Sequence, residues 1–454
     1  MHVLVAKSPQ EGTFYDHPYF GQLFLAGIFW IIGYPNSLHP SASGDVIDSV
    51  YNLWLVPKLL IGIIGVIDTF LVYKISERMY NTKVAFFASI IFAVMPIIWF
   101  LRTIFLESLQ LPFLLSSIWF AVYAKDTTKN NNNNNNNRRY VCMMILSGIF
   151  MGLAIFTKIS VFIMIPLIVF LIFKTSNKKI KAVSIWFIPV ILIPLIWPSY
   201  AFVHSDFDQW WDAVFWQTHR QLSTVTDISK QNSPLNALVK NFIKEPILIG
   251  VGLAGLAFAA IKRDFFMLLW IAPFLVFLYV IGFVRDFHLI PVLPALSISA
   301  ARLIDGLSKY IVNKKLQEIL PFAIILAIAI FGLINVMTLF SNTNNDDEIA
   351  SIALVSKYLQ DNNNDNITMI SQHVYSWIPK YVFHLGNEYL IPELTHYETP
   401  RNEKVLMVVD HAFRDILYGN DPIGKHLMKI YRAHTKNATT VFEDANDKII
   451  LPQP

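Results

Sequence analysis

The chain has 454 residues, of which 54% are apolar and only 15% are charged, and its mean hydropathy is +0.47. Because soluble proteins carry about 25% charged residues, this composition excludes soluble and disordered classes and predicts a polytopic membrane protein. The single cysteine excludes a disulfide scaffold and a cysteine-based zinc site. A net charge of +4 gives no basic patch for nucleic acid.

Apolar runs of about twenty residues predict transmembrane helices along most of the chain. Residues 19–32 form an earlier apolar run that is too short to span, and we expect a helix there that lies in the membrane interface. We expect ten spans, at residues 54–75, 84–101, 104–124, 140–157, 159–174, 182–202, 245–261, 265–283, 288–304 and 318–340.

The basic residues of the loops orient these spans, because loops rich in Lys and Arg stay in the cytoplasm. Basic loops begin near Lys74, Lys125, Lys174, Lys262 and Lys309, and they alternate with the remaining loops under the ten-span interpretation. This alternation predicts that both chain ends and the long loop before the seventh span lie on the outer side of the membrane.

The composition changes after about residue 340, where charged residues and Asn become common. Residues 349–359 have the pattern of an amphipathic helix, and residues 366–372 and 405–409 have the pattern of strands. We therefore expect three regions, which are a partial first outer loop with a juxtamembrane helix (1–53), a transmembrane domain (54–340) and a small extracytoplasmic α/β domain (341–454).

A first polar cluster lies in the N-terminal outer segment and contains Glu11, Tyr15, Asp16 and His17. It places carboxylates and an imidazole just before Pro18, which is typical of a first helical position. These residues are candidates for acid–base chemistry. A purely structural alternative is that Asp16 stabilises the positive end of the helix that follows.

Three more clusters lie at outer ends of predicted spans, where ionisable side chains are costly unless they have a function. Arg102 and Glu107 flank one boundary, and their alternative role is a structural ion pair. Lys158 emerges after a span in which Gly148 and Gly152, four residues apart, predict close helix packing, and its alternative role is a snorkelling lysine. Arg285 and His288 precede a span broken by prolines, and their alternative role is to cap helix ends.

The three cations at one membrane level, Arg102, Lys158 and Arg285, suit the binding of a lipid phosphate. A carboxylate at the same level could activate an acceptor hydroxyl. This combination predicts group transfer from a lipid phosphate on the outer face.

The order of these motifs over residues 11–340 resembles family 39 glycosyltransferases, which include the protein O-mannosyltransferases and the aminoarabinose transferases. The residues that carry the resemblance are Tyr15-Asp16-His17-Pro18 with Gly21, Arg102 with Glu107, Gly152 with Thr157-Lys158, and Arg285 with His288, Pro291 and Pro294. The resemblance implies a polytopic α-helical fold and transfer of a mannose-like hexose, with inversion, from a polyprenyl or dolichyl phosphate to a protein, glycan or lipid acceptor.

On this interpretation the predicted site has three groups of residues. Asp16, Glu107 and Glu11 are the catalytic carboxylates, and Asp16 and Glu107 are candidate ligands of a divalent cation. His17 and Tyr15 support the acceptor or the donor. The donor phosphate would be held by Arg102, Lys158, Arg285 and His288.

The chain departs from the family at its N-terminus. Family members carry an Asp-Glu pair roughly twenty residues before the Asp-His-Pro motif, whereas only fifteen residues precede Asp16 here. We therefore expect that the chain is truncated and that an intact form has eleven or more spans. The alternatives are that Glu11 or Asp16 is the base, or that the protein is a non-catalytic membrane subunit. A secondary transporter is a third class, for which an internal repeat would be evidence.

Overall fold

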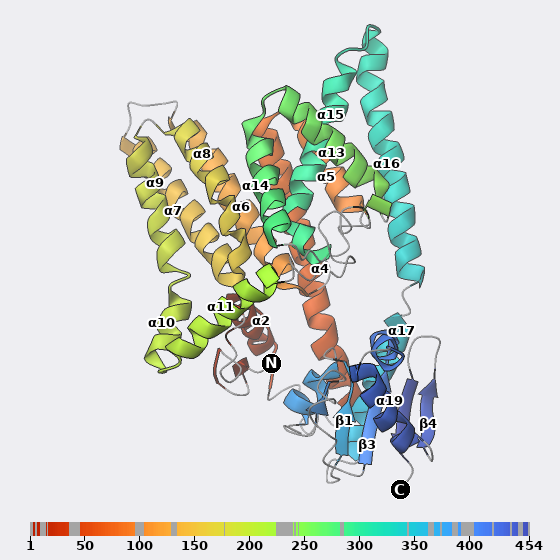
Figure 1. The fold of residues 1–454 in the computed structure, drawn as a ribbon. Helices are drawn as coiled ribbons and strands as arrows, with labels where there is room; N and C mark the ends of the chain where they lie inside the picture. Colours follow the sequence, from red (N-terminus) through yellow and green to blue (C-terminus); the bar gives the residue numbers. More distant parts are fainter. Residues whose placement is uncertain are drawn as a thin grey trace. The chain divides into compact units, whose positions relative to one another are not determined.

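A computed structural model describes most of the chain, and Figure 1 shows its fold. The described residues are 3–4, 7–9, 15, 17–35, 46–95, 104–128, 134–176, 178–223, 239, 242–243, 245–281, 286–342, 345–361, 367–372, 375–383, 389–391, 404–419, 422–435, 438–443 and 448–452. The chain forms two compact units, which are Gln10–Phe24 with Pro57–Leu339, and Met1–Pro9 with Leu25–Val56 and Phe340–Pro454.

The first of these units is a bundle of apolar helices. In chain order the helical elements are α2 (Phe20–Ile31), α4 (Val46–Met79), α5 (Thr82–Val94), α6 (Leu106–Thr128), α7 (Asn134–Thr157), η2 (Ile159–Met164), α8 (Ile165–Thr175), α9 (Lys179–Leu192), α10 (Ile196–Val203), α11 (Phe207–Ser223), α13 (Pro246–Ile261), α14 (Phe265–Ile281), η4 (Asp286–Val292), α15 (Leu293–Ser308) and α16 (Lys314–Asn342). The unit boundaries divide α2 and α4, so each of these helices contributes to both units.

The helices agree with the predicted polytopic membrane protein. Within the described residues six helices are long and apolar enough to cross a membrane, at Tyr51–Met79, Leu106–Ala124, Arg138–Thr157, Lys179–Val203, Phe287–Ser308 and Lys314–Thr338. The predicted spans at 84–101, 159–174, 245–261 and 265–283 fall on shorter apolar helices. The predicted number of ten spans is therefore not established, although a helix lies at every predicted span. The short run at 19–32 forms α2, as expected.

Small residues bring the helices close together, as the glycine spacing predicted. A Cβ atom on Gly148 would lie 2.4 Å from the carbonyl oxygen of Trp186, and one on Gly152 would lie 2.7 Å from that of Pro189. These glycines allow α7 to pack directly on the backbone of α9. Buried hydroxyls then join α7 to α6, since Ser117 and Ser147 each donate to the other's carbonyl over 2.8 Å.

One predicted span is divided into two helices. Residues 182–202 form most of α9 and most of α10, with a turn between Leu192 and Ile196. Pro194 lies in this turn and has no N–H for a helical hydrogen bond, which explains the break.

The second unit contains the predicted α/β region. Its elements are α17 (Asn345–Asp361), β1 (Ile367–Ile370), η6 (Ile378–Val382), β2 (Tyr389–Leu390), β3 (Lys404–Val409), α18 (His411–Leu417), α19 (Pro422–Thr435), β4 (Ala438–Glu443) and β5 (Lys448–Pro452). The described strands form one sheet in the order β2-β1-β3-β5-β4, in which β1 pairs in parallel with β2 and β3, and β5 pairs antiparallel with β3 and β4.

Alternating strand residues give this sheet two apolar faces. Met369 and Leu406 belong to a core that includes Ile352, Val355 and Leu359 of α17. The neighbouring strand residues belong to a second core with helices α18 and α19, formed by Ile370, Val405, Met407, Phe413, Leu417, Leu427 and Ile430. The predicted helix at 349–359 and the two predicted strands are therefore present.

Candidate functional site

The centre of the candidate site is an ion pair between α6 and the end of α7. Helix α7 ends at Thr157, and Lys158 then turns into extended backbone. Its Nζ atom forms a salt bridge with Oε1 of Glu107, which lies in the first turn of α6. The side chains are only 13% and 4% exposed, so the pair is buried. A buried ion pair of this kind is not a snorkelling lysine, which would extend its charge to water. Arg102, the other predicted partner of Glu107, lies outside the described residues.

Gln110 holds the backbone of the same lysine. Its Nε2 atom donates to the carbonyl of Ala154 over 2.8 Å and also to the carbonyl of Lys158. The Ala154 carbonyl also accepts from the backbone N–H of Lys158 over 3.1 Å, so Gln110 adds a second donor at the end of α7 and supplies a donor to the Lys158 carbonyl. Gln110 lies one turn after Glu107 on α6, and the two residues therefore hold the main chain and the ammonium group of Lys158. No role of Gln110 was predicted from the residue pattern.

The predicted residue His288 belongs to the same region. The preceding residue, Phe287, lies in η4 with its ring centroid 5.0 Å from Nζ of Lys158. Phe287 also packs on Phe105 with centroids 5.2 Å apart, and its ring lies 4.5 Å from that of His288. The structure therefore brings Glu107, Lys158 and His288 to one end of the bundle. Arg285 lies outside the described residues.

The N-terminal polar cluster is only partly described. The Tyr15 hydroxyl donates to Oδ2 of Asp206 over 3.0 Å, and burial followed by this bond raises the pKa of Tyr15. Tyr15 and Tyr19 pack in one buried aromatic cluster with Phe156, which precedes Lys158 by two residues. His17 is half-buried. Of the predicted carboxylates in this cluster, Glu11 and Asp16 lie outside the described residues.

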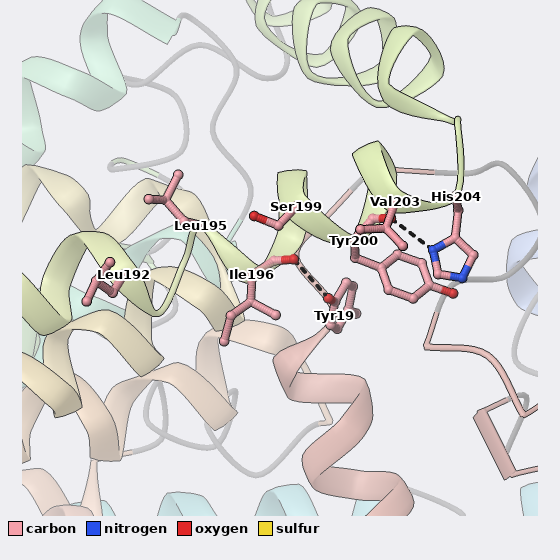
Figure 2. Close-up of a pocket in the computed structure, with 8 residues that line it drawn as sticks. All are labelled: Tyr19, Leu192, Leu195, Ile196, Ser199, Tyr200, Val203 and His204. Atoms are coloured by element: carbon pink, nitrogen blue, oxygen red, sulfur yellow. Dashed lines mark hydrogen bonds between the residues drawn. The ribbon is translucent and has the colours of Figure 1, made fainter.

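A surface hollow of about 490 Å³ lies beside this aromatic cluster, and Figure 2 shows its lining. The lining residues are Tyr19, Leu192, Leu195, Ile196, Ser199, Tyr200, Val203 and His204. The Tyr19 hydroxyl donates to the carbonyl of Ile196 over 3.3 Å, and burial raises the pKa of Tyr19 to about 12. The His204 ring stacks on Tyr200 with centroids 4.0 Å apart. Of the predicted site residues that the structure describes, none lines this hollow.

The described residues do not form a metal centre around Glu107. Its carboxylate faces the Lys158 ammonium group, and no three His, Cys, Asp or Glu side chains gather anywhere in the described part of the chain. The described partner of Glu107 is this ammonium group, and the predicted role of Glu107 as a metal ligand stays a prediction. The predicted metal role of Asp16 stays a prediction, because Asp16 is not described.

Sequence reasoning missed a buried carboxyl group in α4. Asp68 is 1% exposed, and neither of its oxygens has a hydrogen-bond partner among the described residues. The signal was available, because Asp68 is the one acidic residue in the predicted span 54–75. An ionisable group at that depth calls for a function or a partner.

Comparison with known proteins agrees with these observations. Residues 53–202, which contain Glu107 and Lys158, match the sequence profile of the family described as dolichyl-phosphate-mannose-protein mannosyltransferase. No curated protein matches the chain. The predicted resemblance to family 39 glycosyltransferases is thus confirmed over this segment.

Solved structures share the fold over nearly the whole chain. ArnT from Cupriavidus metallidurans bound to undecaprenyl phosphate is 10% identical, with a TM-score of 0.58, and the match covers 97% of this chain and 88% of that one. The oligosaccharyltransferase of Archaeoglobus fulgidus with zinc and sulfate is 12% identical, with a TM-score of 0.57 over 89% of this chain and 61% of that one. AglB from the same organism, in complex with an inhibitory peptide and a dolichol-phosphate, is 11% identical, with a TM-score of 0.51 over 97% of this chain and 67% of that one.

The fold and the family match define the class of this protein. It is a mostly helical, multi-pass membrane protein with the fold of ArnT and of archaeal oligosaccharyltransferase. More particularly, residues 53–202 carry the pattern of the lipid-phosphate-dependent mannosyltransferase family.

Proposed function

We propose that the chain is a membrane glycosyltransferase that moves a mannose-like hexose from a polyprenyl or dolichyl phosphate to a protein, glycan or lipid acceptor. The observation that carries this proposal is the buried Glu107–Lys158 pair, because it lies inside the segment that matches the mannosyltransferase family. Further support comes from proteins of the same fold whose structures hold undecaprenyl phosphate or dolichol-phosphate.

The proposed reaction is a single displacement at the anomeric carbon. The acceptor oxygen forms a bond to this carbon, and the bond from the carbon to the phosphate oxygen breaks, which inverts the configuration. The acceptor proton passes to a carboxylate, and the lipid phosphate leaves with one more negative charge. The reaction therefore needs a base on the acceptor side and cations on the phosphate side.

Lys158 is the proposed cation nearest to the departing phosphate. Its ammonium group has three N–H donors, so it can hold Glu107 and still donate to a phosphate oxygen. A preorganised charge in a site shielded from water stabilises developing charge more strongly than a solvated one. His288, Arg102 and Arg285 are the further proposed phosphate ligands.

Glu107 has a positioning role in this proposal as well as being a site carboxylate. Its bond to Nζ fixes the ammonium group at the end of α7. The proposed base is therefore Asp16 or Glu11, with His17 and Tyr15 supporting the acceptor or the donor. Tyr15 already donates to Asp206, which holds the Tyr15 side chain.

The test is a transfer assay with the full chain in membranes and a panel of radiolabelled polyprenyl-phosphate and dolichyl-phosphate hexoses. We expect label on an acceptor and release of one lipid phosphate for each sugar. Lys158→Met should abolish most of this activity, whereas Lys74→Met, which breaks a half-exposed pair with Glu77, should not. A folded chain that uses no donor of the panel would contradict the proposal.

We also propose that the catalytic end of the bundle and the domain at 341–454 are extracytoplasmic in a cell membrane. The support is the alternation of basic loops along the sequence. In a Cys142→Ser background, Ser341→Cys should react with a membrane-impermeant thiol reagent in intact cells. Protection of that cysteine until the cells are lysed would refute this topology.

A further inference from the structure

Helix α11 carries an exposed stripe of large aromatic side chains. Phe207, Trp211 and Phe215 are 40%, 53% and 53% exposed. They are spaced four residues apart, so they follow one another along a single side of the helix. The rings of Trp211 and Phe215 stack with centroids 6.5 Å apart. Three such rings in water would be unusual for a surface helix.

The other sides of α11 have different partners. Trp210, Ala213 and Val214 pack against the buried aromatic cluster of the bundle. Asp208 and Asp212 are exposed. With about 100° of rotation per residue, the aromatic stripe lies between the side that packs on the bundle and the acidic side. Helix α11 thus has a protein side, an aromatic side and a charged side.

The surface next to the stripe is already expected to face lipid. The candidate span Lys179–Val203 has only 22% of its apolar window buried in the protein, and its last residues, Phe202 and Val203, are 73% and 75% exposed. Helix α11 begins at Phe207, four residues later, and a chain of that length reaches at most about 14 Å. The aromatic stripe therefore continues a lipid-facing surface at the level where the bilayer ends.

The direction of α11 differs from that of the bundle helices. In Figure 1 it runs obliquely across the end of the bundle rather than along those helices. Aromatic residues are also enriched at the boundary between lipid and water, where their rings are partly buried.

We propose that α11 is an interfacial helix whose occupant is the lipid of the membrane surface, with Phe207, Trp211 and Phe215 inserted and Asp208 and Asp212 facing water. This helix also holds the N-terminal segment, because Asp206 directly precedes α11 and accepts the hydrogen bond from Tyr15. Docking on the membrane thereby holds the Tyr15 side chain. The inference does not depend on the proposed glycosyl transfer.

The test places a nitroxide label on single cysteines of the full chain, in the Cys142→Ser background and in phospholipid vesicles. Phe207→Cys, Trp211→Cys and Phe215→Cys report the stripe, and Asp208→Cys and Asp212→Cys are matched controls one position further along. We expect labels on the stripe to collide with oxygen more often than with a water-soluble nickel complex, and the control labels to show the reverse.

Two results would overturn the proposal. Equal access of the nickel complex to stripe and control positions would place α11 in water. Stripe labels shielded from both reagents would indicate a protein partner instead of lipid. Each stripe position gives an independent measurement, so a variant that fails to fold leaves the other two to decide.

Discussion

The most informative perturbation of the site is to remove the Glu107–Lys158 pair one partner at a time and then together. Glu107→Gln keeps the shape of the side chain but leaves the Lys158 ammonium group without its carboxylate. Lys158→Met keeps the length of the side chain but leaves the carboxylate unpaired. The double variant removes both charges and preserves the volume.

The burial of the pair sets the expected effect on stability. Since the side chains are only 13% and 4% exposed, each single variant leaves a buried charge uncompensated, which costs about 3–5 kcal/mol of unfolding free energy. The double variant should recover most of this loss, because well-packed neutral residues often replace a buried pair with little effect. As a control, Glu77→Gln breaks a pair with Lys74 that is 35% and 29% exposed, and should cost less than about 1 kcal/mol.

Donor binding separates a structural role from a functional one. If Lys158 donates to the lipid phosphate, the double variant should be as stable as the unmodified chain but bind labelled dolichyl phosphate about 10- to 100-fold more weakly. This range corresponds to the roughly 1.5–3 kcal/mol of a hydrogen bond to a charged group. Thermal unfolding in detergent and equilibrium binding of the labelled lipid measure the two quantities.

A stable double variant that binds the lipid phosphate as tightly as the unmodified chain would refute this reasoning. The pair would then serve only to close α6 on α7. A Glu107→Gln variant with unchanged stability would refute the burial argument itself.

Three further predictions concern other parts of the chain. Gln110→Leu should lower the free energy of unfolding by about 1–3 kcal/mol, because the Lys158 carbonyl loses its side-chain donor and the Ala154 carbonyl keeps only the Lys158 N–H. Ser108→Ala removes a buried hydroxyl that has no hydrogen-bond partner among the described residues and should be nearly neutral, and equal losses would contradict this. Asp68→Leu should raise the melting temperature, because it replaces a buried carboxyl group that has no hydrogen-bond partner among the described residues with an apolar side chain, and a lower melting temperature would show that the carboxyl group is needed. Burial lowers the pKa of His434, so on acidification the unfolded state binds a proton at a higher pH than the folded state does. The stability of the strand-containing unit should therefore be full above about pH 6.5 and fall below it. The melting temperature of His434→Gln should vary less with pH over this range, and an unchanged pH dependence would contradict the assignment.

The sequence predicted the location of the helices because an apolar run in a membrane protein has few alternatives to a helix. The strands at 366–372 and 405–409 were also predicted, since each is a short apolar run between polar segments. The break after α9 was not predicted, although Pro194 supplies its cause. The long apolar run at 182–202 concealed the turn.

The pairing of the site residues could not be predicted. Glu107 and Lys158 are 51 residues apart, and Tyr15 and Asp206 are 191 residues apart. The charges of the loops predicted that these residues lie on one side of the membrane, but nothing in the pattern joined them into pairs. The role of Gln110 was not predicted, because the candidate residues were chosen for their charge and Gln110 is uncharged. It is nevertheless 1% exposed and donates hydrogen bonds to two carbonyls.

The position of Gln110 bears on the purpose of the ion pair. A lysine that only neutralised Glu107 would need its ammonium group fixed and little else. Here α6 fixes the backbone of Lys158 through Gln110 and its ammonium group through Glu107, while the Phe287 ring lies 5.0 Å from the charge. A charge held in this way needs little rearrangement when a phosphate arrives, which is the condition under which a fixed cation stabilises a leaving group most strongly. The same arrangement explains why the carboxylate most accessible to an acceptor is expected in the segment around Asp16 rather than at Glu107.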